Sequence, residues 1–202
     1  MWRDGMPRII LASGSPRRAE LLAQAGLPFD VRVPAVDETP LDREPPDLYV
    51  TRLARAKALA AAQTGCVTIG ADTSVILDGR ILGKPRDREE GISMIKALGG
   101  RTHQVQTGIA VSDGQRTESL AVSTKVTFRD LGPGEAEAYW DTGEGADKAG
   151  GYGIQGIGGI FAESIQGSFS AVVGLPLTET ESLLRAFGVE TWKLRELHLG
   201  YG

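Results

Sequence analysis

The chain has 202 residues, enough for one ample hydrophobic core or for two lobes around a cleft. A net charge of −4 without any polybasic run argues against a nucleic acid polymer as partner. The single cysteine, Cys66, cannot form an internal disulfide, and no apolar run is long enough for a membrane span or a signal peptide. We therefore expect a cytoplasmic protein with no membrane partner.

The first half of the chain alternates strand-like and helix-like segments. Five short apolar segments are typical of strands, at residues 8–11, 29–33, 67–69, 74–77 and 80–82. A helix is expected after Ser15 as its N-cap, with Pro16 at its first position and Gly26 beyond its end. A long alanine-rich helix is expected at 47–63. The dipeptide at 78–79, Asp-Gly, predicts a tight hairpin.

The second half contains two more hairpin signals, Asp113-Gly114 and Gln166-Gly167. They predict strand pairs at residues 104–112 with 115–129 and 160–165 with 168–173. Helices are expected at 87–98, 133–140 and 176–187. Because helices alternate with hairpins, we expect an α/β protein with a mixed twisted sheet flanked by helices. No linker divides the chain, so residues 1–202 are interpreted as one domain with a loosely held tail at 189–202.

The segment from Leu11 to Arg18 has the features of a phosphate site. Small residues and hydroxyls precede a helix N-terminus, where free N–H groups and the positive end of the helix dipole favour an anion. Arg17 and Arg18 add two permanently charged groups that bind phosphate in a fork. An ordinary capped helix with two solvated arginines explains the same segment equally well.

Two acidic residues stand in polar stretches near predicted strands. Asp72 follows the apolar strand at 67–69, a position where α/β proteins place active-site groups. Its carboxylate can bind a hard dication or accept a proton from water. Glu38 can share such a metal. The alternatives are a turn aspartate that hydrogen-bonds its own backbone and a plain surface acid.

Other candidate residues are cationic or lie among glycines. Lys57, near Arg52 and Arg55, is adequately explained as part of a solvated cationic helix face. Lys84 follows the first hairpin and is easier to direct at a ligand. The glycine-rich stretch at 143–159 permits close backbone approach to a ligand, and Gln155 within it can read a nucleobase edge. An ordinary flexible loop is the alternative.

Familiar nucleotide and metal motifs are not satisfied. The match to G-x-G-x-x-G at residues 151–156 is not preceded by a strand or followed by a helix, and Pro85 stands where a P-loop needs Ser or Thr. His103 and His198 are not paired by spacing and are interpreted as structural or solvated.

Taken in order, several segments resemble the successive motifs of the Maf family from about Ile9 to Phe187. They are LASGSPRR (11–18), RLARAKA (52–58), GADT (70–73), GKP (83–85), THQVQT (102–107), DKAGGYGIQGIGG (147–159) and GSFSAVVGLP (167–176). The resemblance implies a nucleoside triphosphate pyrophosphatase of mixed α/β fold, similar to the inosine-triphosphatase family. It also implies two lobes around a cleft and a homodimer.

The resemblance assigns roles to individual residues. Phosphate and substrate binding fall to Ser15, Arg18, Glu38, Lys57 and Lys84. The proton-accepting aspartate matches Asp72. Substrate preference falls to Arg17, Thr73 and Gln155, which are similar to the branch that acts on dTTP and UTP rather than to the branch that acts on 7-methyl-GTP.

The expected reaction is hydrolysis between the α and β phosphates, giving a nucleoside monophosphate and pyrophosphate. A divalent cation, Mg²⁺ or Mn²⁺, is expected on Glu38 and Asp72, with the phosphate oxygens clamped by Arg18, Lys57 and Lys84. Two alternatives stay open. One is a nucleotide-binding regulator of septum formation and cell division without turnover, and the other is a phosphatase that releases orthophosphate.

Overall fold

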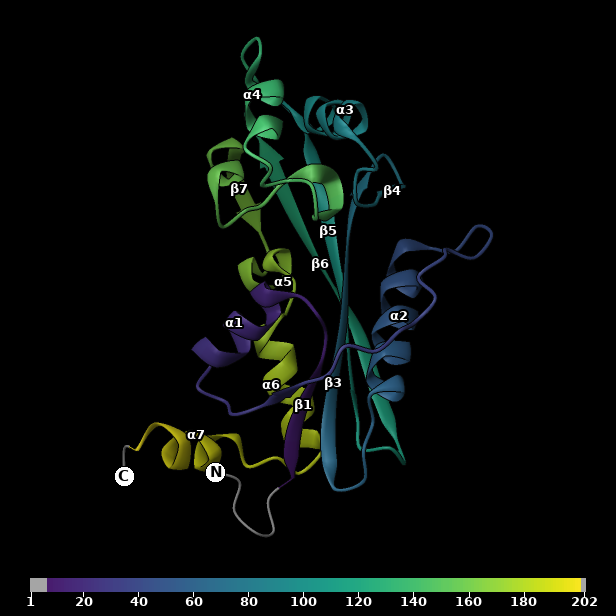
Figure 1. Ribbon diagram of the computed structural model, residues 1–202, viewed down its shortest axis with the longest axis vertical. Coiled ribbons are helices and arrows are strands. Elements are labelled where there is room, and N and C mark those ends of the chain that lie inside the picture. The colour runs from purple at the N-terminus through teal and green to yellow at the C-terminus, as the bar shows by residue number, and fades with distance from the viewer. Residues whose placement is uncertain (1–6, 201–202) are drawn as a thin grey trace. The chain divides into compact units, whose positions relative to one another are not determined.

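The computed structural model describes residues 7–200 (Figure 1). These residues form two compact units. Unit 1 comprises residues up to 72, 107–121 and 174–200, and unit 2 comprises 73–106 and 122–173. Seven strands form a mixed sheet of order β2-β1-β3-β5-β6-β7, with β4 paired to β3. This is the mixed α/β fold that the sequence predicts. None of the helices between residues 7 and 200 has the length and apolar character needed to cross a bilayer.

Unit 1 is built on parallel strands. Strand β1 (Arg8–Ala12) pairs in parallel with β2 (Asp30–Val31) and with β3 (Cys66–Leu77), in the register Ile10↔Thr68 and Ala12↔Gly70. Residues 9–12 are fully or almost fully buried, as expected of a parallel strand covered on both faces. The remaining strands of this unit come from β5 (Thr102–Ser112) and β6 (Thr117–Phe128), which also extend into unit 2.

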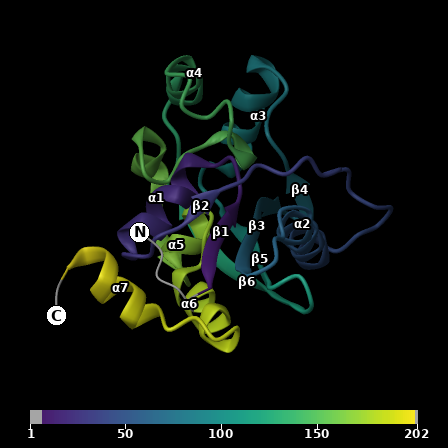
Figure 2. The same ribbon diagram turned by 60° about the horizontal axis from the view of Figure 1, so that its bottom comes forward.

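Four helices belong to unit 1: α1 (Pro16–Gln24), α2 (Pro46–Ala60), α6 (Leu177–Ala186) and α7 (Thr191–Leu199). Helix α2 lies on one side of β1 and β3, and α1 and α6 lie on the other (Figures 1 and 2). Two glycines bring α2 against the sheet. A Cβ at Gly70 would lie 2.2 Å from the carbonyl oxygen of Ala54, and one at Gly108 would lie 2.2 Å from that of Val50.

Unit 2 contains β4 (Arg80–Leu82), α3 (Arg88–Leu98), α4 (Glu135–Asp141), β7 (Ala162–Gln166), α5 (Phe169–Val173) and the short 3₁₀ helices η1 (Ala149–Gly151) and η2 (Ile157–Phe161). Its core includes the aromatic rings of Phe128, Tyr152 and Phe161. His103 is buried among them, edge-on to Phe128 and hydrogen-bonded to the Tyr152 hydroxyl at 2.8 Å. Burial lowers the pKa of His103 to about 4, so it is a neutral core residue.

Several local signals are confirmed. The hairpin between β3 and β4 turns at Asp78 and Gly79, whose φ angles of 51° and 75° are those of a tight primed turn. Helix α1 begins at Pro16 with Ser15 as its N-cap residue, although the Ser15 side chain makes no capping hydrogen bond. Helix α3 has in addition a cap that was not expected, because the side chain of Asp87 accepts from the Glu90 amide at 2.9 Å.

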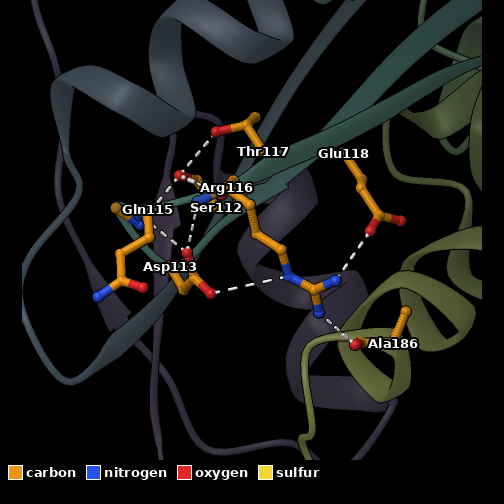
Figure 3. Close-up of polar contacts among 8 residues, drawn as sticks. Ser112, Asp113, Gln115, Arg116, Thr117, Glu118 and Ala186 are labelled. Atoms are coloured by element: carbon orange, nitrogen blue, oxygen red, sulfur yellow. Dashed lines mark hydrogen bonds and ion pairs between the residues drawn. The ribbon is translucent and has the colours of Figure 1, made fainter.

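A turn connects β5 and β6 at the expected Asp113-Gly114, but β6 begins at Thr117 and not at residue 115, so the turn is longer than the two residues expected (Figure 3). The Asp113 carboxylate accepts hydrogen bonds from the amides of Gln115 and Arg116, at 2.9 and 2.8 Å. The Arg116 guanidinium in turn donates to the carbonyl of Ala186 and lies 4.2 Å from the ring centre of Phe187. One arginine therefore joins this turn to the end of α6 within unit 1.

Two expectations about strands are wrong. Segments 67–69 and 74–77 are not separate strands, because β3 runs continuously from Cys66 to Leu77. The third hairpin is absent from the described structure, since residues after Gly167 form helix α5, whose first turn is closed by the Ser168 hydroxyl accepting from the Ala171 amide at 3.2 Å.

The tail expected at 189–202 is not loosely held in its described part, because residues 191–199 form helix α7 within unit 1, and residues 201–202 lie outside the described residues. Val189, just before α7, and Leu194, within it, are buried. Arg195 forms an ion pair with Glu181 at 2.7 Å and donates a hydrogen bond to the Ala25 carbonyl at the same distance. Tertiary contacts with residues distant in sequence hold this helix in place, and a local sequence pattern does not predict such contacts.

Candidate active site

A buried lysine joins two carboxylates in unit 1. The Nζ atom of Lys57 lies 2.7 Å from Oδ1 of Asp72 and 2.7 Å from Oε1 of Glu38. The side chains of Lys57 and Asp72 are each 11% exposed, whereas that of Glu38 is 52% exposed. Three of the residues assigned by resemblance therefore converge from three separate segments, and Lys57 is not part of a solvated helix face.

Asp72 occupies a different local setting from the one expected. It lies inside β3, not in a loop that follows a strand. The parallel pairing with β1 ends at Ala12↔Gly70, so Asp72 lies two residues beyond the carboxyl end of that pairing. The strand continues because Val75 to Leu77 pair with β4. The carboxylate is therefore held by a rigid strand at the place where the neighbouring parallel strand has ended.

Burial and the neighbouring cations have opposing effects on the pKa of the Asp72 carboxyl. Burial raises the pKa of the Asp72 carboxyl, while the charge and hydrogen bond of Lys57 and the charge of Arg18 oppose that effect. The net direction is upward, so Asp72 is a stronger base than an exposed aspartate. A carboxylate with this property is suited to accepting a proton from water.

Arg18 is fixed at the start of α1. Its Nε donates to the carbonyl of Gly174 at 2.8 Å and its Nη1 donates to the hydroxyl of Ser13 at 3.1 Å. Burial lowers the pKa of the Arg18 guanidinium and the charge of Asp72 raises it, and the group stays charged because arginine titrates far above neutrality. The segment thus presents an oriented cation rather than a solvated one.

One hydroxyl that contacts Arg18 belongs to Ser13, a residue to which the sequence motifs assigned no role. The Ser13 hydroxyl accepts hydrogen bonds from Arg18 and, at 3.2 Å, from the Ser15 amide. Ser15 and Arg17 are both partly exposed on the first turn of α1. The sequence does contain a signal for Ser13, because it is the first of the two serines in the segment at 11–18.

The remaining assigned residues belong to unit 2. Thr73 directly follows Asp72 in β3 and is partly exposed, Lys84 is exposed after β4, and Gln155 is exposed between η1 and η2. The structure thus brings together Arg18, Glu38, Lys57 and Asp72 in unit 1, and it describes Thr73, Lys84 and Gln155 within unit 2.

The glycine-rich stretch around Gln155 has an internal anchor. The Glu144 carboxylate accepts hydrogen bonds from the amides of Ile157 and Gly158, at 2.7 and 2.9 Å, and from the Tyr139 hydroxyl at 2.8 Å. A Cβ at Gly156 would lie 2.1 Å from that carboxylate, so a larger residue there would displace the Glu144 side chain from these hydrogen bonds. The segment is therefore an ordered loop wrapped around one acid.

The two carboxylates of the site also bear on metal binding. Across residues 7–200, no three or more His, Cys, Asp or Glu side chains are grouped so that they could hold an ion by themselves. Asp72 and Glu38 supply hard oxygen donors from two segments. Mg²⁺ is commonly bound by one or two carboxylates together with substrate phosphates and water, so this pair fits a cation that arrives with a nucleotide.

The sequence is similar to one protein family and to several named proteins over most of its length. The family model described as "Maf-like protein" matches residues 8–187. A protein of Vibrio cholerae named "dTTP/UTP pyrophosphatase" is 51% identical over 89% of this chain and 98% of its own. Proteins of the same name from Pseudoalteromonas atlantica and Saccharophagus degradans are 50% and 47% identical, over 87% and 94% of this chain and 95% and 93% of their own. The chain therefore belongs to the Maf-like protein family.

Proposed function

We propose that this protein is a nucleoside triphosphate pyrophosphatase that hydrolyses dTTP and UTP to the monophosphate and pyrophosphate. The observation that carries the proposal is the buried contact of Lys57 with Asp72 and Glu38, in a chain about half identical to proteins named "dTTP/UTP pyrophosphatase". We also propose that the protein is cytoplasmic, as its composition suggests, and a homodimer, as the family resemblance implies.

In the proposed reaction, Asp72 accepts a proton from a water molecule that attacks the α-phosphorus. The bond from the α-phosphorus to the bridging oxygen breaks, and pyrophosphate leaves with the electron pair. The raised pKa of Asp72 strengthens it as a base, while Lys57 and Arg18 favour its ionised form.

Cationic and hydroxyl groups bind the triphosphate in this proposal. Arg18 is oriented by its hydrogen bonds to Gly174 and Ser13, and it would contact phosphate oxygens where charge develops. Lys57, Lys84 and Ser15 complete the set. Fixed donors of this kind stabilise the transition state because they need no reorganisation at the moment of reaction.

A divalent cation, Mg²⁺ or Mn²⁺, would be held by Asp72 and Glu38. When bound, such a cation neutralises triphosphate charge and polarises the reacting phosphorus. The Glu38 and Asp72 carboxylates lie close together because both contact the Lys57 ammonium, so the cation would bind beside that ammonium and not in its place.

Base and sugar recognition are assigned to Arg17, Thr73 and Gln155. An amide side chain both donates and accepts hydrogen bonds, so Gln155 can pair with a pyrimidine edge. The Glu144 anchor would limit the movement of the loop that carries it.

The decisive experiment incubates the purified protein with a panel of nucleotides and Mg²⁺ and separates orthophosphate from pyrophosphate. We expect pyrophosphate from dTTP and UTP, and a loss of about 10²- to 10⁴-fold in kcat for Asp72→Asn, because a general base contributes about that much. The control is Asp78→Asn, an exposed aspartate in the turn after β3, which should retain activity.

Each other result has a defined meaning. Nucleotide binding without any product would favour the regulator of septum formation, and orthophosphate as the sole product would favour a phosphatase. Near-normal pyrophosphate release by a folded Asp72→Asn protein would remove Asp72 as the base.

A further inference from the structure

The loop that carries Glu38 is attached to helix α2 by its backbone as well as by the Glu38 carboxylate. The Tyr49 hydroxyl donates to the carbonyl oxygen of Glu38 at 2.9 Å. Arg52 donates from Nη2 to the carbonyl oxygen of Thr39 at 3.1 Å. Because α2 also carries Lys57, one helix fixes both the position of Glu38 and the ammonium that Glu38 contacts.

A second acid completes this attachment. Glu44 receives two hydrogen bonds from Arg52, Nε to Oε1 at 2.6 Å and Nη2 to Oε2 at 2.7 Å. Its Oε2 also accepts from the amide of Leu41 at 3.0 Å. The Glu44 side chain is only 7% exposed, and that of Arg52 is 31% exposed. Two-point contacts of this kind fix geometry as well as charge, so they close the loop from 38 to 44 onto α2.

The electrostatics keep this contact intact at neutral pH. Hydrogen bonding from Arg52 is the main cause that lowers the pKa of the Glu44 carboxyl, and the same contact raises the pKa of Arg52. Both groups are therefore charged together wherever the enzyme would act.

Glu38 needs such support because burial does not hold it. Its side chain is 52% exposed and it lies outside any helix or strand, in contrast to Asp72 in β3. Small displacements of a reacting or ligand-binding group are costly, about 10²-fold for 1 Å in unfavourable cases. The hydrogen bond from Arg52 to the Thr39 carbonyl limits the displacement of the backbone next to Glu38.

We propose that Arg52 and Glu44 are positioning residues, which hold the 38–44 loop so that the Glu38 carboxylate meets Lys57 and Asp72. This inference rests on the proposed function for its catalytic consequence. Neither residue contacts substrate in the proposal; both act through Glu38.

The kinetic test is a double-mutant cycle with dTTP as substrate. In the wild-type background, Arg52→Gln and Glu44→Gln should each lower kcat/KM by roughly 10- to 100-fold, as removal of outer-shell partners of a ligating group does. In a Glu38→Gln background the same changes should cost no more than about 2-fold, since the group that they position is no longer a carboxylate. Equal losses in both backgrounds would overturn the proposal.

Arg55→Gln is the matched control. Arg55 lies on the same helix and is also a partly buried arginine, but it donates to the carbonyl of Thr117 and the hydroxyl of Ser119 on β6. Its loss should leave kcat/KM unchanged. The exchanged pair Arg52→Glu with Glu44→Arg should recover part of the activity that either single change removes, because the ion pair is restored in reverse.

Hydrogen exchange tests the loop without relying on turnover. In Arg52→Gln, amides between 38 and 44, that of Leu41 above all, should exchange about 10-fold faster or more than in the wild type, and Arg55→Gln should not change them. Unchanged exchange would overturn the attachment, and faster exchange with unchanged kcat/KM would overturn the positioning role. A wild-type protein that exchanges as expected but releases no pyrophosphate would instead contradict the proposed function.

Discussion

Lys57 has an ammonium group that is nearly buried and is shared by Asp72 and Glu38. Burying an ion pair is costly, and hydrophobic residues of similar size often stabilise a fold as well or better. Stability is therefore a weak reason for this arrangement. A catalytic reason is stronger, because the positive charge keeps Asp72 available as a carboxylate despite its burial.

The pH dependence of activity should report this coupling. Asp72 accepts a proton only when ionised, so kcat/KM should fall as pH decreases through its pKa. Replacing Lys57 by Met removes a charge that lowers this pKa, so the acid limb of the profile should move to higher pH, in addition to a loss of rate. The measurement is kcat/KM for dTTP across the acid and neutral range.

The control for this prediction is Lys96→Gln. Lys96 lies in α3 and forms an exposed ion pair with Glu137, so its loss removes the same charge without touching Asp72. The control profile should keep the acid limb of the wild type. An unmoved acid limb in Lys57→Met would show that another group titrates there.

Among the elements, β3 and α2 are the pair that sets the geometry of the site. Lys57 comes from α2 and Asp72 from β3, so their contact depends on how closely the two backbones approach. Gly70 and the small residues Ala54 and Ala58 permit that approach. The glycine is therefore a packing requirement rather than a flexible joint.

Gly70→Ala should test this packing. The new Cβ would lie 2.2 Å from the Ala54 carbonyl oxygen and 2.6 Å from the Ala58 nitrogen, and neither backbone atom can rotate away. We expect a loss of about 1–3 kcal/mol in the free energy of unfolding, as over-packed cores show, with reduced activity. Denaturant unfolding followed by circular dichroism measures the first quantity.

Gly83→Ala is the comparison, because a Cβ at Gly83 has nothing within 4 Å and its φ is not positive. Its free energy of unfolding should change by no more than about 0.5 kcal/mol. Equal stability of the two alanine variants would mean that α2 can shift away from β3 at little cost.

At the scale of the whole molecule, the assigned residues are divided between two units. Those proposed for proton transfer and the proposed specificity residue Arg17 lie in unit 1, whereas Lys84, Thr73 and Gln155 lie in unit 2. The effect of a substitution should therefore follow the role of the residue rather than its unit. Changes at Asp72 or Lys57 should lower the rate for every substrate, and changes at Gln155 should alter the choice among substrates.

Gln155→Ala tests that division. Losing a hydrogen bond to the base is worth about 1.4 kcal/mol, so the ratio of kcat/KM for dTTP over dCTP should fall about tenfold. Gln115→Ala is the control, since Gln115 lies in the β5–β6 turn and only its backbone amide is hydrogen-bonded there (Figure 3). An unchanged ratio in Gln155→Ala would end its assignment to specificity.

Local chemistry explains which expectations were confirmed. Turn residues such as Asp78-Gly79 and helix starts such as Ser15-Pro16 act within a few residues, so a short stretch of sequence contains the whole signal. Residues 168–173 form a short, mostly apolar stretch, a pattern that strands and buried helices share, so the pattern alone does not distinguish helix α5 from the expected strand.

By itself, the sequence determined the mixed α/β class, the turns and helix starts, and the family motifs. Only the tertiary structure decided that β3 is continuous through Asp72, that α7 packs on Glu181 and the end of α1, and that Lys57 is buried between two acids. The physical reason is distance along the chain. Lys57 meets Asp72 only after β1, β3 and α2 have packed, and a lysine among arginines on a helix has no local feature that distinguishes it from a solvated one.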